Sequence, residues 1–497
     1  MNFLDRVISA ISPEAGVRRI GARQMLDAHS RAYAAAKHGR RNKGWSGRAT
    51  SANAEVGSSL RELRNRSREF VRDSWAGQRM LDVLVSHSVG TGIVTVSDTG
   101  NDRVDNSVKL VFEEWSEQAD IEGVLDWPGM QALSVRSMIE GGDTVVRHID
   151  IPLNDAGRTV PVRLLGLESD QIDTTRDGMS GSGSRLGVEL GEWGRRKGLW
   201  LLDNHPGEFT AASTASALVG WNDLAHLYRP LRFGQVRGVP WFSSILLTAR
   251  ELQDIVEATL VKMRVEASFG GFIKRTSAGH SPLVAKTDDK SDKPITRIEP
   301  GMIVDIGDGE ISFANPSSQT AFGEVYMASN MAMAAGAGIT YDQLTGDLRN
   351  ANYSSLRAGK IEFRRLVEQT QWTILVPRLI APTKRRVLDR AILAGRLKSR
   401  DRQGGYRLKH IMPAVEPIDP KKDLEADILA CRSGRLAPQE FIGAWGRDWR
   451  DVVNDTASFM EFLDKQRDGA GLALDIDARN PMKGSANVGQ NKPDAED

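Results

Sequence analysis

The stretch from Gly338 to Gln371, GITYDQLTGDLRNANYSSLRAGKIEFRRLVEQTQ, is the most informative part of this sequence. Its first half has no apolar period and is rich in Gly, Asp, Asn and Thr, which predicts an exposed loop. Its second half predicts a helix, because apolar residues recur there at helical spacing. The positions on that apolar face are Phe363, Leu366, Val367, Thr370 and Ile374.

A second face of the same helix is basic, and it contains Arg357, Lys360, Arg364 and Arg365. Ser354 or Ser355 can cap the first turn, and Pro377 is expected to end the helix. A polar loop that leads into a long basic helix suits contact with a polyanion such as DNA. A solvated loop followed by an ordinary surface helix is the alternative that these residues leave open.

Several motifs resemble one protein family. NYSSLRA at Asn352–Ala358, preceded by GITYDQL at Gly338–Leu344, is similar to the signature of the lambda-type portal proteins of tailed bacteriophages. RPLRFGQVRGVPW at Arg229–Trp241 is a second match, and LRNRSREF…LVSHSVGTGI, from Leu63, resembles the family's opening. The resemblance extends from about Leu60 to Leu472. Proteins of this family form the ring at one capsid vertex through which DNA is packaged and later ejected.

Composition bounds the possible functions. The chain has 497 residues, 40% of them hydrophobic, and a formal net charge of +1. A protein that grips DNA tightly usually has a strong basic excess, whereas a channel in which DNA slides should avoid deep electrostatic traps. Its one cysteine, Cys431, excludes an intramolecular disulfide and fits a reducing cytoplasm. No apolar run reaches the ~18 residues of a transmembrane helix, and the first residues make a poor signal peptide.

The resemblance implies an α+β portal fold that forms rings. Its expected parts are a mixed α/β wing, a two-helix stem, a small β-rich clip, a channel loop and a helical crown. The expected boundaries are a basic, partly disordered N-terminal arm at 1–56, wing at 57–240, first stem helix at 241–268, clip at 269–318, second stem helix at 319–336, channel loop at 337–352, long wing helix with a following helix at 353–415, crown at 416–475 and disordered tail at 476–497. The arm is either a nucleic-acid or scaffold-binding segment or a flexible terminus.

The patterns in the expected wing predict helices followed by strands. Ser59 and Glu62 form a capping-box pattern that predicts a helical region from Ser58 to about His87, ended by Gly90. Another amphipathic helix is predicted over 106–117, and a third before Gly141. Strands are predicted over 144–149, within 160–173, and on both sides of a turn near Gly194.

The expected stem rests on two helices. The first, Ser243 to Ser268, is about 39 Å long, and its apolar positions fall in one narrow stripe: Ile245, Ala249, Leu252, Val256, Leu260, Met263 and Ala267. Packing against neighbouring helices or subunits is favoured over burial in a core. The second helix, Thr320 to Ala335, is rich in Ala and Met, which suits either close approach around a ring or a tightly packed hairpin. In the expected crown, the last helix is predicted to begin after the cap Asp448.

The resemblance also implies sites and partners. DNA-channel residues are expected at Asp347, Arg349, Asn350, Asn352, Arg357 and Lys360, and terminase-docking residues at Lys286, Asp288, Asp289, Lys290, Asp292 and Lys293. The expected partners are twelve copies of the chain itself, the terminase large subunit, head–tail connector proteins, the major capsid and scaffold proteins, and double-stranded DNA held without sequence preference. The expected place is the portal vertex of the virion, assembled in the host cytoplasm without a membrane, and a role in starting procapsid assembly is implied.

No catalytic motif and no cofactor are predicted. Gly359-Lys360 lacks the glycine-rich turn of a P-loop, and no HExxH zinc motif is present. Asp475 and Asp477 have the chemistry of metal ligands but lie beside a polar tail, where solvated charges are expected. The alternatives to a portal protein are a metal-dependent nuclease and a DNA-binding protein of a mobile element. The first needs a carboxylate cluster and the second needs a basic domain.

Overall fold

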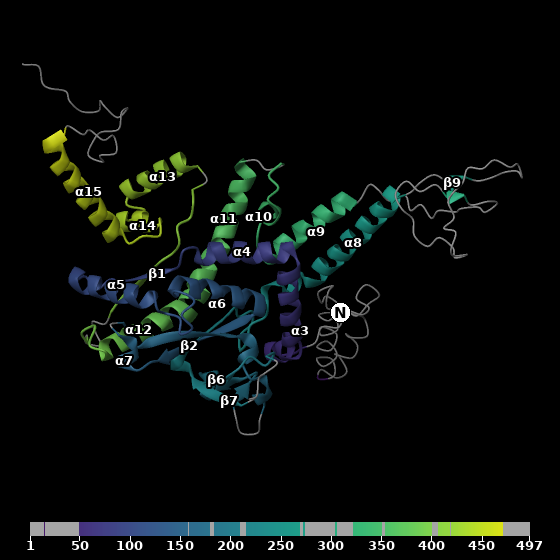
Figure 1. Ribbon diagram of the computed structural model, residues 1–497, viewed down its shortest axis with the longest axis horizontal. Helices are drawn as coiled ribbons and strands as arrows, with labels where there is room; N and C mark the ends of the chain where they lie inside the picture. Colours follow the sequence, from purple (N-terminus) through teal and green to yellow (C-terminus); the bar gives the residue numbers. More distant parts are fainter. Residues whose placement is uncertain are drawn as a thin grey trace, which may run out of the picture. The chain divides into compact units, whose positions relative to one another are not determined.

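The computed structural model describes residue 14 and residues 49–157, 159–178, 183–208, 215–268, 272–273, 304–305, 322–349, 353–399, 406–417 and 419–470. Contacts divide the chain into two units, Met1–Ser51 and Ala52–Asp497. The second unit contains the helices and strands that are labelled in Figure 1.

Two helices joined almost end to end open this unit: α3 (Ala52–Asp73) and α4 (Trp75–Val89). The helical region was predicted, but its predicted start at Ser58 is wrong, and Ser59 lies inside α3. The stretch forms a pair of helices, and the break between them, whose position was not predicted, falls at Ser74. Gly77 makes that turn possible, because a Cβ there would lie 2.4 Å from the Phe70 carbonyl oxygen. Gly90, with φ of +52°, ends α4 as predicted.

The largest core lies between helices and a three-stranded sheet. Strand β2 (Asp143–Asp150) pairs antiparallel with β3 (Val162–Glu168) on one side and β8 (Leu224–Tyr228) on the other. Helices α5 (Asp102–Ser116) and α6 (Trp127–Gly141) precede this sheet in the chain, and α6 contacts β2, β3 and β8. The predicted apolar face of α5 is confirmed, since Val108, Val111, Phe112 and Trp115 are all buried.

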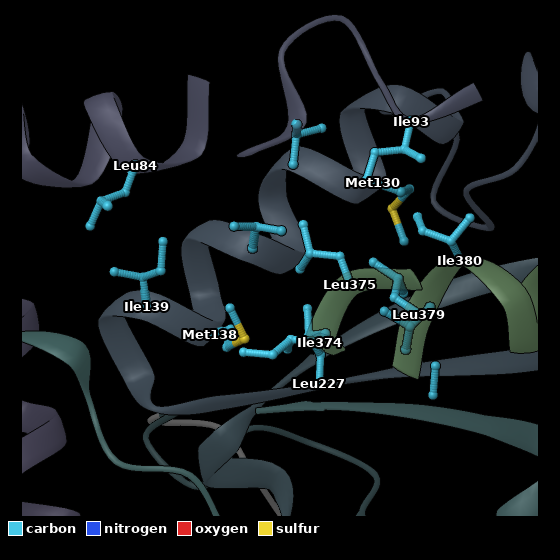
Figure 2. Close-up of a cluster of buried hydrophobic side chains, with 14 of the residues drawn as sticks. Leu84, Ile93, Met130, Met138, Ile139, Leu227, Ile374, Leu375, Leu379 and Ile380 are labelled. Carbon is cyan, nitrogen blue, oxygen red and sulfur yellow. The ribbon is translucent and has the colours of Figure 1, made fainter. Parts of the chain in front are cut away.

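Figure 2 shows how distant segments share this core. Met138 from α6 and Leu227 from β8 lie beside Ile374 of the segment Gln371–Ile380, and Leu84 from α4 and Ile139 from α6 belong to the same cluster. Each apolar side chain buried there contributes about 1.5–3 kcal/mol. The core therefore holds the end of the sequence's long basic helix against the sheet.

A second, smaller core lies under a four-stranded antiparallel sheet with the order β4-β5-β6-β7. Its strands are β4 (Ser184–Arg185), β5 (Val188–Leu190), β6 (Arg196–Leu202) and β7 (Ser216–Gly220). The predicted turn near Gly194 is confirmed between β5 and β6. Gly198 lets β7 approach, because a Cβ on it would lie 2.2 Å from the Val219 carbonyl oxygen.

The two predicted stem helices are confirmed as helices. They are α8 (Leu246–Ser268) and α9 (Phe322–Ala337), and they contact each other. Gly336 brings α9 against the turn before α8, since a Cβ there would lie 2.3 Å from Ile245 Cγ2. Gly336 and the buried Ala334 and Ala337 thus serve packing within the subunit, whereas Ala328, Ala332 and Ala335 are exposed. Of the expected clip between them, only the short parallel pair β9 (Phe272–Ile273) and β10 (Val304–Asp305) is described.

The predicted exposed loop at 338–352 is partly wrong. It contains the short helix α10 (Tyr341–Thr345), whose capping box joins Thr340 and Gln343. Ile339 and Leu344 are buried, at 5% and 2% exposure. These two apolar residues anchor the segment in the core, but two residues are too few to form an apolar period. A one-turn helix of this kind is therefore not predicted from apolar spacing.

The long basic helix continues past its predicted end. Helix α11 (Tyr353–Thr370) runs into the π-helical segment Gln371–Ile380 and then into α12 (Ala381–Leu393). Pro377 lies inside the π-helical segment. A proline has no backbone N–H to donate and ordinarily breaks an α-helix, but here the hydrogen-bond pattern is π-helical and the helix continues. Ser354 and Ser355 lie within the first turn and are not its caps.

The remaining elements follow after α12. Strand β11 (Leu408–Ile411) returns to pair antiparallel with β1 (Val94–Ser97). Helices α13 (Pro420–Arg432), α14 (Pro438–Gly443) and α15 (Trp449–Ala470) form the helical piece predicted near the C-terminus, and α15 begins after Asp448 as expected. A four-residue helix, α7 (Leu153–Ala156), lies earlier in the chain, between β2 and β3.

Candidate DNA-channel and subunit-contact site

The turn that follows α10 carries the first expected channel residues. Gly346 ends α10 in the left-handed conformation, with φ of +70°. Asp347 then accepts three bonds from Arg349: from the backbone N–H at 3.1 Å, from Nε at 2.9 Å and from Nη2 at 2.7 Å. These hydrogen bonds lower the pKa of Asp347 to about 2. The turn therefore presents an ion pair rather than a free cation.

Helix α11 carries the next two expected channel residues, Arg357 and Lys360. Arg357 Nη2 lies 3.4 Å from Asp423 Oδ1 on α13, so this arginine joins α11 to the C-terminal helices. Lys360 is exposed one turn further along. The apolar face of α11 is buried as predicted at Phe363, Val367 and Thr370, while Leu366 is half-buried. The structure thus brings acidic partners to two of the four described channel candidates.

The other expected site residues lie outside the described part of the chain. These are the channel residues Asn350 and Asn352 and all six terminase-docking residues, Lys286, Asp288, Asp289, Lys290, Asp292 and Lys293. The expected N-terminal arm lies almost entirely outside it, and the expected tail at 476–497 lies wholly outside it.

Helices α8 and α9 expose apolar side chains along part of their length. The apolar stripe of α8 is buried near its start, where Ile245 and Leu252 are 4% and 7% exposed, but Leu260 and Met263 are 49% and 54% exposed. On α9, Val325, Met327 and Met331 are exposed too. An apolar stripe that leaves the core and continues into solvent is typical of a contact between proteins.

The C-terminal helices show the same feature. No residue of α13 or α14 is buried, and large apolar side chains stand exposed on the three helices and their connections: Leu424, Ile428, Leu429, Trp445, Val453, Phe459 and Phe462. A groove of about 1,070 Å³ lies between α11, the β1–β11 pair and α14. It is lined by apolar residues such as Phe363, Trp372 and Trp449 beside Glu368 and Glu440.

Sequence reasoning missed a buried ionic cluster. The Arg237 guanidinium, from the RPLRFGQVRGVPW motif, pairs with Asp143 at the start of β2, and both side chains are 0% exposed. Arg237 Nη2 also donates to the Ser169 carbonyl at 3.0 Å, and His226 Nε2 lies 3.2 Å from Asp143 Oδ2. Buried charges are seldom predictable from a single sequence. The available signal was an arginine placed directly between a valine and a glycine, Val236 and Gly238.

One group of side chains has metal-ligand chemistry within the described residues: Glu168, Asp170 and His205. Arg68 binds both carboxylates, and Arg64 Nη2 lies 2.9 Å from Asp170 Oδ1. The positive charge that a metal ion would supply is therefore already present. The group gives the nuclease alternative no support.

No helix among the described residues combines the length and apolarity needed to cross a membrane.

Comparison with known proteins identifies the family. The sequence profile described as "Phage portal protein, lambda family" matches residues 38–371. The probable portal protein of Halomonas phage phiHAP-1 is 24% identical over 446 residues, which cover 86% of this chain and 85% of that protein.

Solved structures of gene transfer agent particles are similar in part. A chain from the neck of the empty particle has a TM-score of 0.42 at 14% identity, and one from the virion of the native particle has 0.40 at 13%. Each alignment covers 78% of this chain and 93% of the other. At these TM-scores the likeness carries no functional weight. The family profile, which spans most of the chain, shows that this protein belongs to the lambda family of phage portal proteins.

Proposed function

We propose that copies of this portal protein, twelve by the family's pattern, close into a ring around a channel for double-stranded DNA at one vertex of the capsid. The observation that carries the proposal is the apolar stripe of α8, which is buried at Leu252 and exposed at Leu260 and Met263. Burial of such a stripe on a neighbour is favourable by about 25 cal/mol per Å². Repetition of a heterologous contact closes a ring when its rotation permits.

The segment from Asp347 to Lys360 lines the channel in this proposal. Its described charges are mostly balanced inside the subunit, as Arg349 pairs with Asp347 and Arg357 with Asp423. Lys360 contributes an exposed cation on α11. Each phosphate neutralised by a free cation strengthens DNA binding through counterion release, and this effect multiplies around a ring. A nearly neutral lining lets DNA slide. Asn350 and Asn352 fit the same lining because they offer hydrogen bonds without charge.

The remaining roles follow from the family and from the sequence. Terminase docks on the segment 269–318, where Lys286, Asp288, Asp289, Lys290, Asp292 and Lys293 form a mixed-charge run between the two long helices. Head–tail connector proteins bind the ring after terminase. Capsid and scaffold proteins meet the ring during procapsid assembly, which the ring starts. No catalytic step is assigned to the chain.

A single-cysteine labelling experiment tests the channel assignment. In a Cys431→Ser background, Arg349→Cys places a thiol in the proposed channel and Glu62→Cys places one on the exposed surface of α3 as a control. In DNA-filled heads, maleimide should label position 349 much more slowly than in emptied heads. Position 62 should react equally in both. Equal labelling of position 349 in filled and emptied heads would contradict the channel assignment.

A further inference from the structure

Lys384 on α12 is buried in a cage of aromatic rings. It is 4% exposed, and its Nζ lies 4.0 Å from the ring centre of Phe112, 5.2 Å from Trp115 and 5.7 Å from Trp127. Among the described residues, it has no hydrogen-bond or ion-pair partner. The ring faces stabilise an ammonium group electrostatically. They do not supply the negative partner that a buried charge normally has.

Lys384 lines a cavity of about 310 Å³ between α5, β1, α6 and the start of α15. Most of the wall is apolar, and it includes Ile93, Val94, Val96, Phe112, Trp127 and Pro128. The volume is at the lower end for a small-molecule site. An apolar chamber with one unpaired cation is complementary to a small molecule that has an apolar body and one negative group.

The start of α15 also lies at this cavity. Asp448, directly before this 22-residue helix, and Asp451 in its first turn line the cavity. A helix N-terminus carries a partial positive charge from its unpaired N–H groups, but here these carboxylates offset that charge. Lys384 is therefore the feature of the cavity that favours an anion.

The acidic residues at the cavity are already engaged. Asp451 pairs with Lys109, and Asp448 Oδ1 accepts from the Arg450 backbone N–H at 3.1 Å. Glu113, whose side chain is 59% exposed, lies 3.9 Å from the Lys109 ammonium. None of the three is paired with Lys384.

We propose that this cavity binds a carboxylate on a short apolar chain, with the acid group paired to the Lys384 ammonium and the chain against the apolar wall. Either a free carboxylic acid or a glutamate side chain from a neighbouring copy presents this chemistry. A single buried cation matches one negative charge, which favours a carboxylate over a phosphate dianion.

Protonation of Lys384 controls the proposed binding. Burial lowers the pKa of Lys384 to about 7, so the free site loses its positive charge as the pH rises through neutrality. The other titratable or charged groups around the cavity and beside Lys384 are Lys109 and Glu113 on α5, Arg447, Asp448 and Asp451 at α15, His410 on β11 and Arg385 on α12. Burial, followed by the charges of Lys384 and Arg385, lowers the pKa of His410.

Calorimetric titration of the full-length protein tests the site with hexanoate and its neutral analogue hexanamide. Hexanoate should bind at about pH 6, and hexanamide should bind at least tenfold more weakly. Lys384→Met should abolish hexanoate binding. Glu113→Gln, which removes a carboxylate from the same cavity, should leave the affinity unchanged or higher. Raising the pH to about 8.5 should weaken hexanoate binding roughly 30-fold, because the charged fraction of a lysine with a pKa of about 7 falls by that factor.

Equal affinity for hexanoate and hexanamide, full binding by the Lys384→Met variant, or no binding at either pH would overturn the proposal. The comparison of the two ligands requires no variant, so it holds even if Lys384→Met fails to fold. Repeating the titration on assembled rings and on a monomeric variant distinguishes the two sources. If hexanoate binds both the rings and the monomer, the natural occupant is a free carboxylic acid. If hexanoate binds the monomer alone, the site in the ring is filled by a glutamate side chain of the neighbouring copy.

Discussion

The Arg237 guanidinium and the Asp143 carboxylate form a fully buried ion pair, in which Nη2 lies 3.2 Å from Oδ1 and Nε also contacts Oδ2. Asp143 begins β2 directly after Gly142, and Arg237 belongs to the motif between β8 and α8. A Cβ on Gly238 would lie 1.9 Å from the Gly142 carbonyl oxygen. The pair therefore fixes the approach to α8 against the end of α6, and so connects the three-stranded sheet to α8.

Breaking this pair should destabilise the protein strongly. Asp143→Asn or Arg237→Met leaves a buried charge without its partner, which costs about 3–5 kcal/mol of the free energy of unfolding. The control is Arg232→Met, which removes an arginine from the same motif. Its pair with Glu55 is about half exposed on both sides and should contribute about 0–1 kcal/mol. Urea unfolding of the three variants measures the difference. Equal losses for Arg237→Met and Arg232→Met would contradict the importance of the buried pair.

Stability should fall as the pH drops below neutrality. Burial is the main cause that lowers the pKa of His148 to about 4, and likewise that of His226. In the unfolded chain a histidine titrates at about 6.5. The unfolded state therefore binds more protons between about pH 6.5 and 4, and each histidine costs about 1.4 kcal/mol of stability per pH unit there. Above this window the stabilisation is complete.

Urea unfolding as a function of pH checks this sign. His148→Gln keeps a group that can bond to Thr383 Oγ1, which lies 3.0 Å from His148 Nε2, but it removes one titration. The variant should lose less stability between about pH 6.5 and 5 than the unchanged protein does. A stability that is flat across this window, or that rises as the pH falls, would refute the assignment of neutral buried histidines.

Charging the exposed part of the α8 stripe should prevent ring formation without unfolding the subunit. Leu260→Asp and Met263→Asp place carboxylates where a neighbour is proposed to pack, and both sites are already about half exposed. The unfolding free energy of the subunit should change by less than about 1 kcal/mol. Ala258→Asp adds the same charge to the opposite, exposed face of α8 and should leave assembly intact. Mass photometry reports the subunit number of each variant. Normal assembly of the Leu260 and Met263 variants would exclude this surface from the ring contact.

Extra lysines in the proposed channel segment should slow the movement of DNA through the ring during packaging. Asn350→Lys with Asn352→Lys adds two charges per subunit around the whole ring, and each neutralised phosphate strengthens binding. Assembly and terminase docking should persist while packaged DNA decreases. Arg349→Ala should have a milder effect, mainly on DNA retention, because its charge is already balanced by Asp347. Packaging at the normal rate by the double-lysine variant would show that these residues lie outside the channel.

Deletion of Ser281 to Pro294 should weaken the capture of terminase in a pull-down and leave the ring intact. The deleted run holds all six proposed docking residues. A matched control replaces the run with a Gly/Ser segment of the same length, which keeps the connection but removes the charges. Unchanged terminase capture by both variants would show that the docking surface lies elsewhere.

Local patterns in the sequence predicted most of the helices and strands. The faces of α5 and α11 follow a regular apolar period, so their buried residues were predictable one by one. Helix α10 was not, because two buried residues, Ile339 and Leu344, form no period. Pro377 gave the opposite error, because it was predicted to end a helix that in fact continues. A π-helical segment tolerates a proline that would end an ordinary α-helix.

Features that depend on contacts between distant segments were beyond the sequence. Arg237 and Asp143 are 94 residues apart, and no spacing rule joins them. Lys384 was predicted only as part of the helix that follows the long wing helix, yet the folding of α5 and α6 around it turns this lysine into a buried cation. The proposed channel segment was identified through the family's motif. The pairing of its charges with Asp347 and Asp423 became visible only in three dimensions.

Electron microscopy of the purified protein tests the central claim most directly. The account predicts closed rings with a central hole wide enough for duplex DNA, seen in negative stain and confirmed by light scattering. A protein that stays monomeric across salt and protein concentrations, also with scaffold and capsid proteins present, would contradict it.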